Sequence, residues 1–168
     1  MRKISFVIFL LAFAFTVKAQ DGFRAEVNIG LPIGDYREFY NFSLQGNIYY
    51  LWETSENFNI GLTTGALVFL GDASEDWCDG CLYDDYEPEL YIPLALASRA
   101  NLSKGFSIGL DIGYAFFVHV FDDGGGLYIR PVITYNLKEK LALIASYTNI
   151  SESGYSAATI NLGVNFGF

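Results

Sequence analysis

The two cysteines of the chain lie in the segment WCDGC at 77–81, with the Cys-x-x-Cys spacing of dithiol redox sites. Such a site reacts through a thiolate, which nearby cations or a helix N-terminus stabilise. Residues 71–89 contain eight acids, no Lys or Arg, and no helical pattern, so a thiolate is disfavoured here. We therefore predict a structural disulfide between Cys78 and Cys81, formed in an oxidising compartment.

The acids of residues 71–89 also bear on metal binding, because Ca²⁺ prefers clustered carboxylate oxygens. Their order lacks the EF-hand spacing, and a solvated segment that repels anions is the simpler interpretation. We predict no metal site. One hypothesis stays open, in which divalent ions of a lipopolysaccharide layer bridge this segment to lipid phosphates.

His119 is the only histidine of the chain. Some outer-membrane lipid A deacylases pair such a His with a Ser two positions later, but Phe121 stands at that position here. A lone His without partners does not make a catalytic set. We predict no catalytic residue and no cofactor, and keep a lipid-modifying enzyme as an alternative.

The N-terminus predicts export. Arg2 and Lys3 precede an apolar run over 4–17, and Lys18-Ala19-Gln20 follows it. This is the order of a signal peptide, and the run is shorter than the roughly 20 apolar residues of a membrane-spanning helix. We expect residues 1–19 to be cleaved off and 20–168 to form the mature domain.

Composition narrows the class of the mature domain. The chain has 168 residues, 52% of them hydrophobic, and a net charge of -9. That apolar content excludes a disordered chain, and the negative charge argues against nucleic acid as a partner. One domain is expected from the length.

Apolar residues alternate with polar or small ones after residue 20, which is the period of β-strands. Eight such runs are expected, at 23–31, 42–53, 58–70, 90–99, 106–118, 127–136, 141–148 and 158–168. The connections alternate in length: short at 54–57, 103–105 and 138–140, longer at 32–41, 71–89, 121–126 and 151–156. This order predicts an all-β, eight-stranded antiparallel up-and-down transmembrane barrel with both termini in the periplasm.

The apolar face is expected to meet lipid. A lipocalin-like soluble barrel that binds an apolar ligand would place this face inside, but large side chains would overfill an eight-stranded lumen. The other face is Gly, Ser, Thr, Asn and Gln with few charges, which suits a narrow interior. An outward girdle of aromatic residues is expected near the periplasmic ends of the strands, formed by Trp52, Phe58, Phe106, Tyr135, Phe166 and Phe168.

Ionisable residues on the inward face need partners or water. We predict that they form a mixed-sign network that fills the lumen, with Arg99 and Asp111 in contact across adjacent strands. An ion-selective pore is the alternative. The inward set consists of Arg24, Glu26, Glu53, Arg99, Asp111 and Arg130.

The sequence 161–168, Asn-Leu-Gly-Val-Asn-Phe-Gly-Phe, carries a resemblance to a known family. The mature chain resembles the small outer-membrane β-barrels that include the OmpA transmembrane domain and OmpX. The resemblance implies an outer-membrane location in a Gram-negative bacterium. It also implies that Phe166 and Phe168 form the C-terminal signal read by the barrel-insertion machinery. A fold of this kind does not specify a function.

The leading expectation for function is a non-enzymatic surface protein in contact with lipid and lipopolysaccharide. Its outward connections would bind the surface layer or a protein partner. A narrow porin, a lipid-modifying enzyme and a soluble ligand-binding barrel are the alternatives. The aromatic residues expected in these connections are Tyr36, Phe39, Tyr40, Trp77, Tyr83, Tyr86 and Tyr155.

Overall fold

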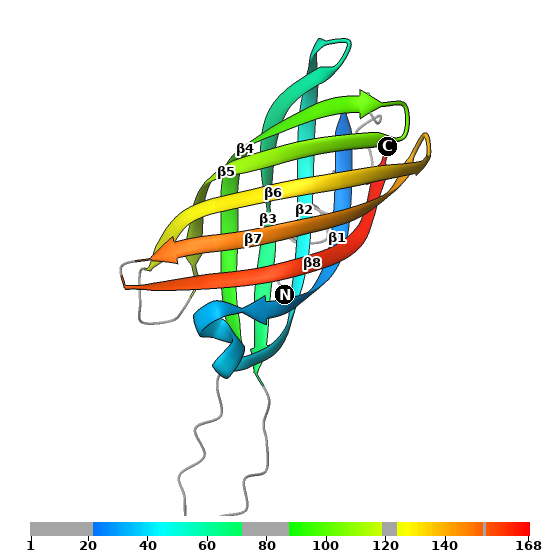
Figure 1. The fold of residues 1–168 in the computed structure, drawn as a ribbon. Helices are drawn as coiled ribbons and strands as arrows, with labels where there is room; N and C mark the ends of the chain where they lie inside the picture. Colours follow the sequence, from blue (N-terminus) through cyan, green and yellow to red (C-terminus); the bar gives the residue numbers. More distant parts are fainter. Residues whose placement is uncertain (1–21, 72–87, 119–123, 153) are drawn as a thin grey trace, which may run out of the picture.

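The computed structural model describes residues 22–71, 88–118, 124–152 and 154–168. They form eight strands and one short 3-10 helix (Figure 1). In chain order the elements are β1 (Phe23–Ile33), η1 (Gly34–Glu38), β2 (Tyr40–Ser55), β3 (Phe58–Gly71), β4 (Glu89–Ser103), β5 (Phe106–Phe117), β6 (Gly125–Lys138), β7 (Leu141–Glu152) and β8 (Tyr155–Gly167).

Each strand pairs antiparallel with its neighbour in the chain, and β1 pairs with β8 to close the barrel. The predicted eight-stranded up-and-down barrel is confirmed. The shortest strand, β1, has 11 residues, which meets the roughly 9–11 residues that a tilted strand needs to cross a bilayer. Among the described residues, no helix is long and apolar enough to cross a membrane.

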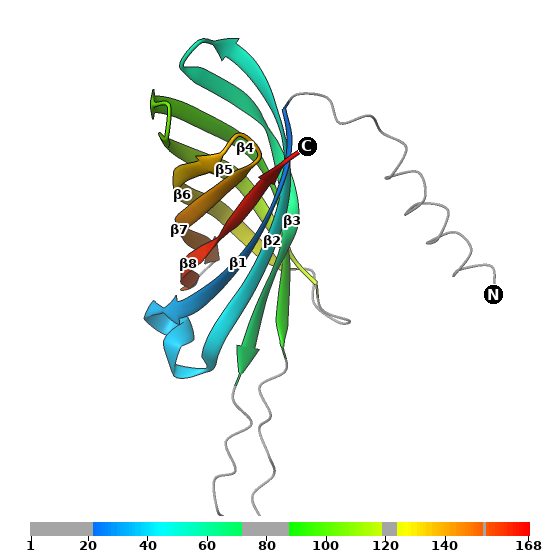
Figure 2. The same cartoon turned by 90° about the vertical axis from the view of Figure 1, so that its right-hand side faces the viewer.

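The three connections predicted to be short are two-residue turns, at 56–57, 104–105 and 139–140. They lie at the end of the barrel where β1 begins and β8 ends (Figures 1 and 2). We call this end the periplasmic end and the opposite one the outward end.

The expectation of a longer connection over 151–156 was wrong. The β7–β8 ladder continues to the pair Glu152↔Tyr155, so only residues 153–154 join the strands. Gly154 has a φ of 106°, a conformation that glycine adopts without steric cost and that permits so tight a turn. The alternating pattern is weak in this polar stretch, and pairing with β7 extends the strand beyond it.

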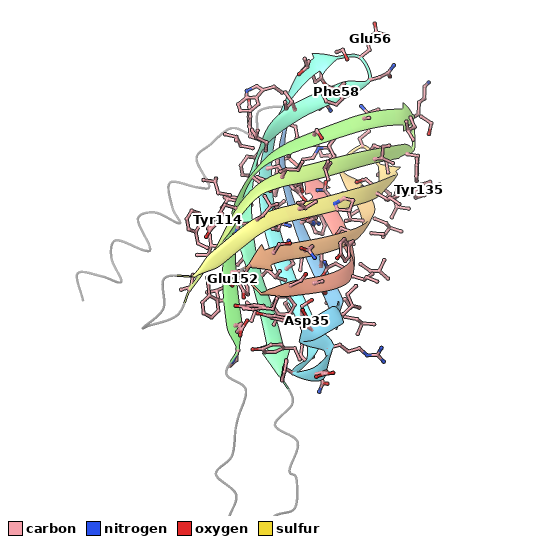
Figure 3. The ribbon with its side chains drawn as sticks, turned by 60° about the vertical axis from the view of Figure 1, so that its left-hand side comes forward. Asp35, Glu56, Phe58, Tyr114, Tyr135 and Glu152 are labelled. Carbon is pink, nitrogen blue, oxygen red and sulfur yellow. The ribbon has the colours of Figure 1, made fainter. Side chains whose placement is uncertain are left out.

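The distribution of side chains is the reverse of that in a soluble protein. Leu31 is 67% exposed and Leu162 is 63% exposed, whereas Arg130 and Asp111 are fully buried in the lumen. Of the predicted girdle, Phe106 is half-buried and the other five side chains are exposed. Phe58 and Tyr135 point outward near the periplasmic end, where Glu56 marks a turn (Figure 3). An apolar exterior around a charged interior is stable only where the exterior is in contact with lipid.

Candidate functional site

Arg130, on β6, is the centre of the buried cluster in the lumen. Its guanidinium forms ion pairs with Glu26 on β1 and with Asp111 on β5, where Nη1 lies 3.2 Å from Oδ2. Its Nε donates to Ser146 Oγ at 3.2 Å, and its Nη1 donates to the Tyr49 hydroxyl at 3.3 Å. One side chain thus connects strands on opposite walls of the barrel.

Arg99, on β4, adds a second cation to this cluster. Its Nη1 and Nη2 donate to the two oxygens of Asp111 at 2.5 and 3.2 Å. The guanidinium carbon lies 5.2 Å from the centre of the Tyr49 ring, in the geometry of a cation–π contact. Asp111 therefore accepts from two arginines at once, and such charge-assisted bonds are stronger than neutral ones.

Neutral amides and hydroxyls surround the charged cluster and form with it a layer across the lumen. Glu26 Oε1 accepts from Asn28 Nδ2 at 3.1 Å and from Asn47 Nδ2 at 2.6 Å. Gln45 donates to the Tyr128 hydroxyl at 3.0 Å and accepts from Thr148 Oγ1 at 2.9 Å. Polar groups from β1, β2, β6 and β7 are therefore bonded to one another across the interior.

The structure brings together four of the six residues predicted for the lumen, namely Glu26, Arg99, Asp111 and Arg130. Arg24 is half-buried nearer the periplasmic end. Including Glu53 in this set was wrong, because β2 continues to Ser55 and Glu53 is exposed at its end. Sequence reasoning did not single out the neutral partners Asn28, Gln45, Asn47 and Tyr128, although their inward positions in the alternation were a usable signal.

A second cluster closes the outward end. Tyr36, on η1, is buried and stacks on Tyr40, with ring centres 5.1 Å apart. Its hydroxyl donates to Glu89 and lies 2.8 Å from the Tyr91 hydroxyl. Burial and the bond to Glu89 raise the pKa of Tyr36 well above its usual range.

Of the aromatic residues expected in the outward connections, two do not lie on an exposed surface. Tyr36 and Tyr40 point inward because η1 folds over the mouth of the barrel, where Asp35 Oδ2 accepts from the Ser156 N–H at 3.2 Å. Phe39 and Tyr155 are exposed. Trp77, Tyr83 and Tyr86 lie outside the described residues.

Other predictions also fall on residues that the structure does not describe. These are the signal peptide at 1–19, the disulfide between Cys78 and Cys81, the acidic segment, and His119. Within the described ranges, no group of three or more His, Cys, Asp and Glu residues is placed to hold a metal ion.

Comparison with known proteins places the fold. No family model matches the chain, and no curated protein matches its sequence. Among solved structures, the outer membrane protein Ail of Yersinia pestis in a nanodisc has a TM-score of 0.58 and 13% identity. The match covers 88% of this chain and all of Ail. The chain has the fold of the small outer-membrane β-barrels.

Two further structures agree on this outer-membrane barrel fold. The N-terminal β-barrel domain of Pseudomonas aeruginosa OprF gives a TM-score of 0.52 at 14% identity and covers 90% of this chain and all of that domain. A de novo designed transmembrane barrel, TMB2.3, gives 0.57 at 8% identity, with 91% and 98% covered. A designed protein with no natural function gives a TM-score similar to those of the natural barrels. These similarities therefore indicate the fold and say nothing about function.

Proposed function

We propose that this protein is an integral outer-membrane barrel whose lumen is closed by its own side chains. It acts without catalysis, through the contacts of its outward end. The observation that supports this most directly is the layer around Arg130, where ion pairs and hydrogen bonds from opposite walls meet in the centre of the barrel.

The energetics of this layer favour a closed lumen. Arg130, Asp111 and Glu26 are all at most 2% exposed, and together with Arg99 their charges compensate one another. Removing one partner from a buried pair leaves an uncompensated charge, so opening a path would cost several interactions together. An open narrow porin would require water in place of these contacts.

Single-channel conductance in a planar lipid bilayer tests the closed lumen. The refolded protein should give silent bilayers. Protease protection of the protein in lipid vesicles, from the same preparation, shows that it inserts. A double variant with Asp111→Ala and Arg130→Ala removes the central side chains and should produce small current steps. Glu56→Gln, on an exposed periplasmic turn, is the matched control and should stay silent. Reproducible steps from the unmodified protein would contradict the proposal and favour the narrow porin.

The outward end has the charge and the hollow expected of a binding surface for a cationic partner. The connections 34–39, 72–88 and 118–124 contain eleven of the nineteen acids of the chain and one base, Arg37. A hollow of about 230 Å³ opens beside η1. It is lined by Asp35, Tyr36, Phe39, Tyr40, Glu89 and Tyr155. We propose that this end binds basic protein segments or divalent ions held at lipopolysaccharide phosphates.

Calorimetric titration of the refolded protein with Ca²⁺ and with an oligolysine peptide tests this part of the proposal. Binding that weakens as NaCl is raised from low concentration to 0.5 M is the expected result, because exposed charges are screened by salt. A variant with Asp35→Asn and Glu89→Gln should bind more weakly. The absence of heat with both titrants would contradict a cationic partner.

A further inference from the structure

The periplasmic half of the lumen contains a polar cavity. It lies on the periplasmic side of the closed layer, by which we mean the network around Arg130. Its volume is about 40 Å³, which is room for about three water molecules. Two arginines and six amides or hydroxyls line it, and no carboxylate does so among the described residues. The polar lining consists of Arg24, Asn59, Arg99, Asn101, Ser107, Thr134, Asn136 and Asn165.

The cationic charge of the lumen is concentrated toward the periplasmic side. Among the described inward residues, the arginines are at 24, 99 and 130, and the buried carboxylates near them are Glu26 and Asp111, whereas Glu89 lies at the outward end, bonded to Tyr36 and Tyr91. Glu26 and Asp111 are bonded to Arg99 or Arg130 in the central layer, and Arg24 is in none of these three ion pairs. Arg24 and Arg99 border the same cavity, so two positive charges face one small polar space. A buried positive charge is stabilised by an anion.

The cavity is reached from the periplasmic side. A larger hollow of about 590 Å³ lies at that end and shares Arg24, Leu51 and Asn59 with the small cavity. The charged side chains around the larger hollow besides Arg24 are Glu53, Glu139 and Lys140, and Phe168, the last residue of the sequence, also lines it. On the inner side, Arg99 and its partner Asp111 mark the beginning of the central layer.

From this arrangement we propose that the cavity binds one small free oxyanion from the periplasm, of the size of inorganic phosphate. Guanidinium groups match oxyanions in shape and donate two parallel hydrogen bonds to them. Arg24 supplies a positive charge that the central ion pairs do not use, and the hydroxyls of Ser107 and Thr134 and the nearby amides supply neutral donors. The closed layer prevents the ion from crossing the barrel.

The test is phosphorus NMR of inorganic phosphate with the refolded protein in maltoside micelles, which contain no phosphorus. Ionic strength is held constant with NaCl, so that general screening does not change. The unmodified protein should broaden the phosphate line in a saturable way. Arg24→Gln should weaken binding by about tenfold or more, since a charge-assisted bond is lost. Lys140→Gln makes the same charge change in the larger periplasmic hollow. It should leave the affinity for phosphate within about twofold of that of the unmodified protein.

A second variant and a second ligand complete the test. Thr134→Val removes a donor without changing charge and should weaken binding several-fold, which covers the case that Arg24→Gln does not refold. Glycerophosphoethanolamine, a phosphodiester headgroup, should not bind because the cavity is too small for it. The proposal is overturned by absent or non-saturable broadening, by equal losses in Arg24→Gln and Lys140→Gln, or by unchanged binding in Thr134→Val. Binding of the phosphodiester would show that the site takes a lipid headgroup and not a free ion.

Discussion

Arg130 and Asp111 face each other directly across the β5–β6 pair, with Nη1 and Oδ2 3.2 Å apart and both side chains fully buried. Asp111 also accepts from Arg99, so this one carboxylate compensates two cations. The ion pair is a consequence of register, because a shift of one residue would turn one side chain toward lipid.

Replacing Asp111 by Asn should destabilise the barrel by roughly 3–5 kcal/mol, because two buried guanidinium groups would lose their shared counter-charge. Urea unfolding in phospholipid vesicles, followed by tryptophan fluorescence, measures the change. Glu56→Gln removes a carboxylate from an exposed turn and should change stability by no more than about 0.5 kcal/mol. A loss for Asp111→Asn as small as that of the control would mean that the pair contributes little.

Adding a methyl group at Gly109 should also be destabilising. A Cβ there would lie 2.4 Å from Arg99 Cδ and 2.5 Å from the Ser98 carbonyl oxygen, so the backbone and the arginine would both have to move. Overpacking of this kind costs about 1–3 kcal/mol. At Gly46, the nearest atom to such a Cβ is 3.8 Å away, so Gly46→Ala is the matched control and should be close to neutral. Equal unfolding midpoints for the two variants would contradict the crowding.

The lipid-facing surface can be tested with arginine substitutions at two depths. Leu94 is 55% exposed near the middle of β4, and Leu102 is 61% exposed near its periplasmic end. In a bilayer, Leu94→Arg should cost about 2–4 kcal/mol and Leu102→Arg about 0–1 kcal/mol. A barrel whose exterior lies in water would tolerate both equally, so equal unfolding free energies in vesicles would contradict the membrane orientation.

Tyr36 predicts a loss of stability at alkaline pH. Its pKa is raised in the folded protein above the value of 10.0 that an unfolded chain would show, so the folded state retains the proton longer. Stability should therefore fall as the pH rises above 10. Tyr36→Phe removes the bonds to Glu89 and Tyr91 and should cost about 1–3 kcal/mol near neutral pH. The variant should show a smaller alkaline loss in thermal melts, and an unchanged slope would contradict the role of Tyr36.

The outward charge predicts a difference from Ail, which has been solved in complex with the heparin analogue sucrose octasulfate. The acidic connections of this chain should repel such a polyanion. Calorimetry with sucrose octasulfate at low salt should show no binding, and oligolysine is the positive control. Measurable binding of sucrose octasulfate at the outward end would contradict the proposed cationic partner.

The alternation of residue types was enough to predict the strands, the barrel and the inward position of Glu26, Arg99, Asp111 and Arg130. It could not predict that Arg130 meets Glu26 across the lumen, because that contact depends on how the tilted strands are staggered around the closed barrel. The position of Glu53 could not be predicted either. The alternation of inward and outward residues continues to the end of β2, but the enclosed interior of the barrel ends before Glu53.

The outward end was harder to predict for a different reason. Nothing in the local pattern of 34–38 indicates that a 3-10 turn will direct Tyr36 into the mouth of the barrel. Its position depends on Glu89 and Tyr91, which lie on a distant strand.

The pairing of β1 with β8, from Arg24↔Gly167 to Ile33↔Ala158, has a consequence for biogenesis. These strands come from opposite ends of the described chain, so the contact order is high and folding is expected to be slow. A sheet without its eighth strand would carry two open edges, which lipid does not tolerate. We therefore expect membrane entry to be all-or-none. A chain truncated before residue 155 should accumulate in the periplasm as a substrate for proteases rather than assemble as a smaller barrel.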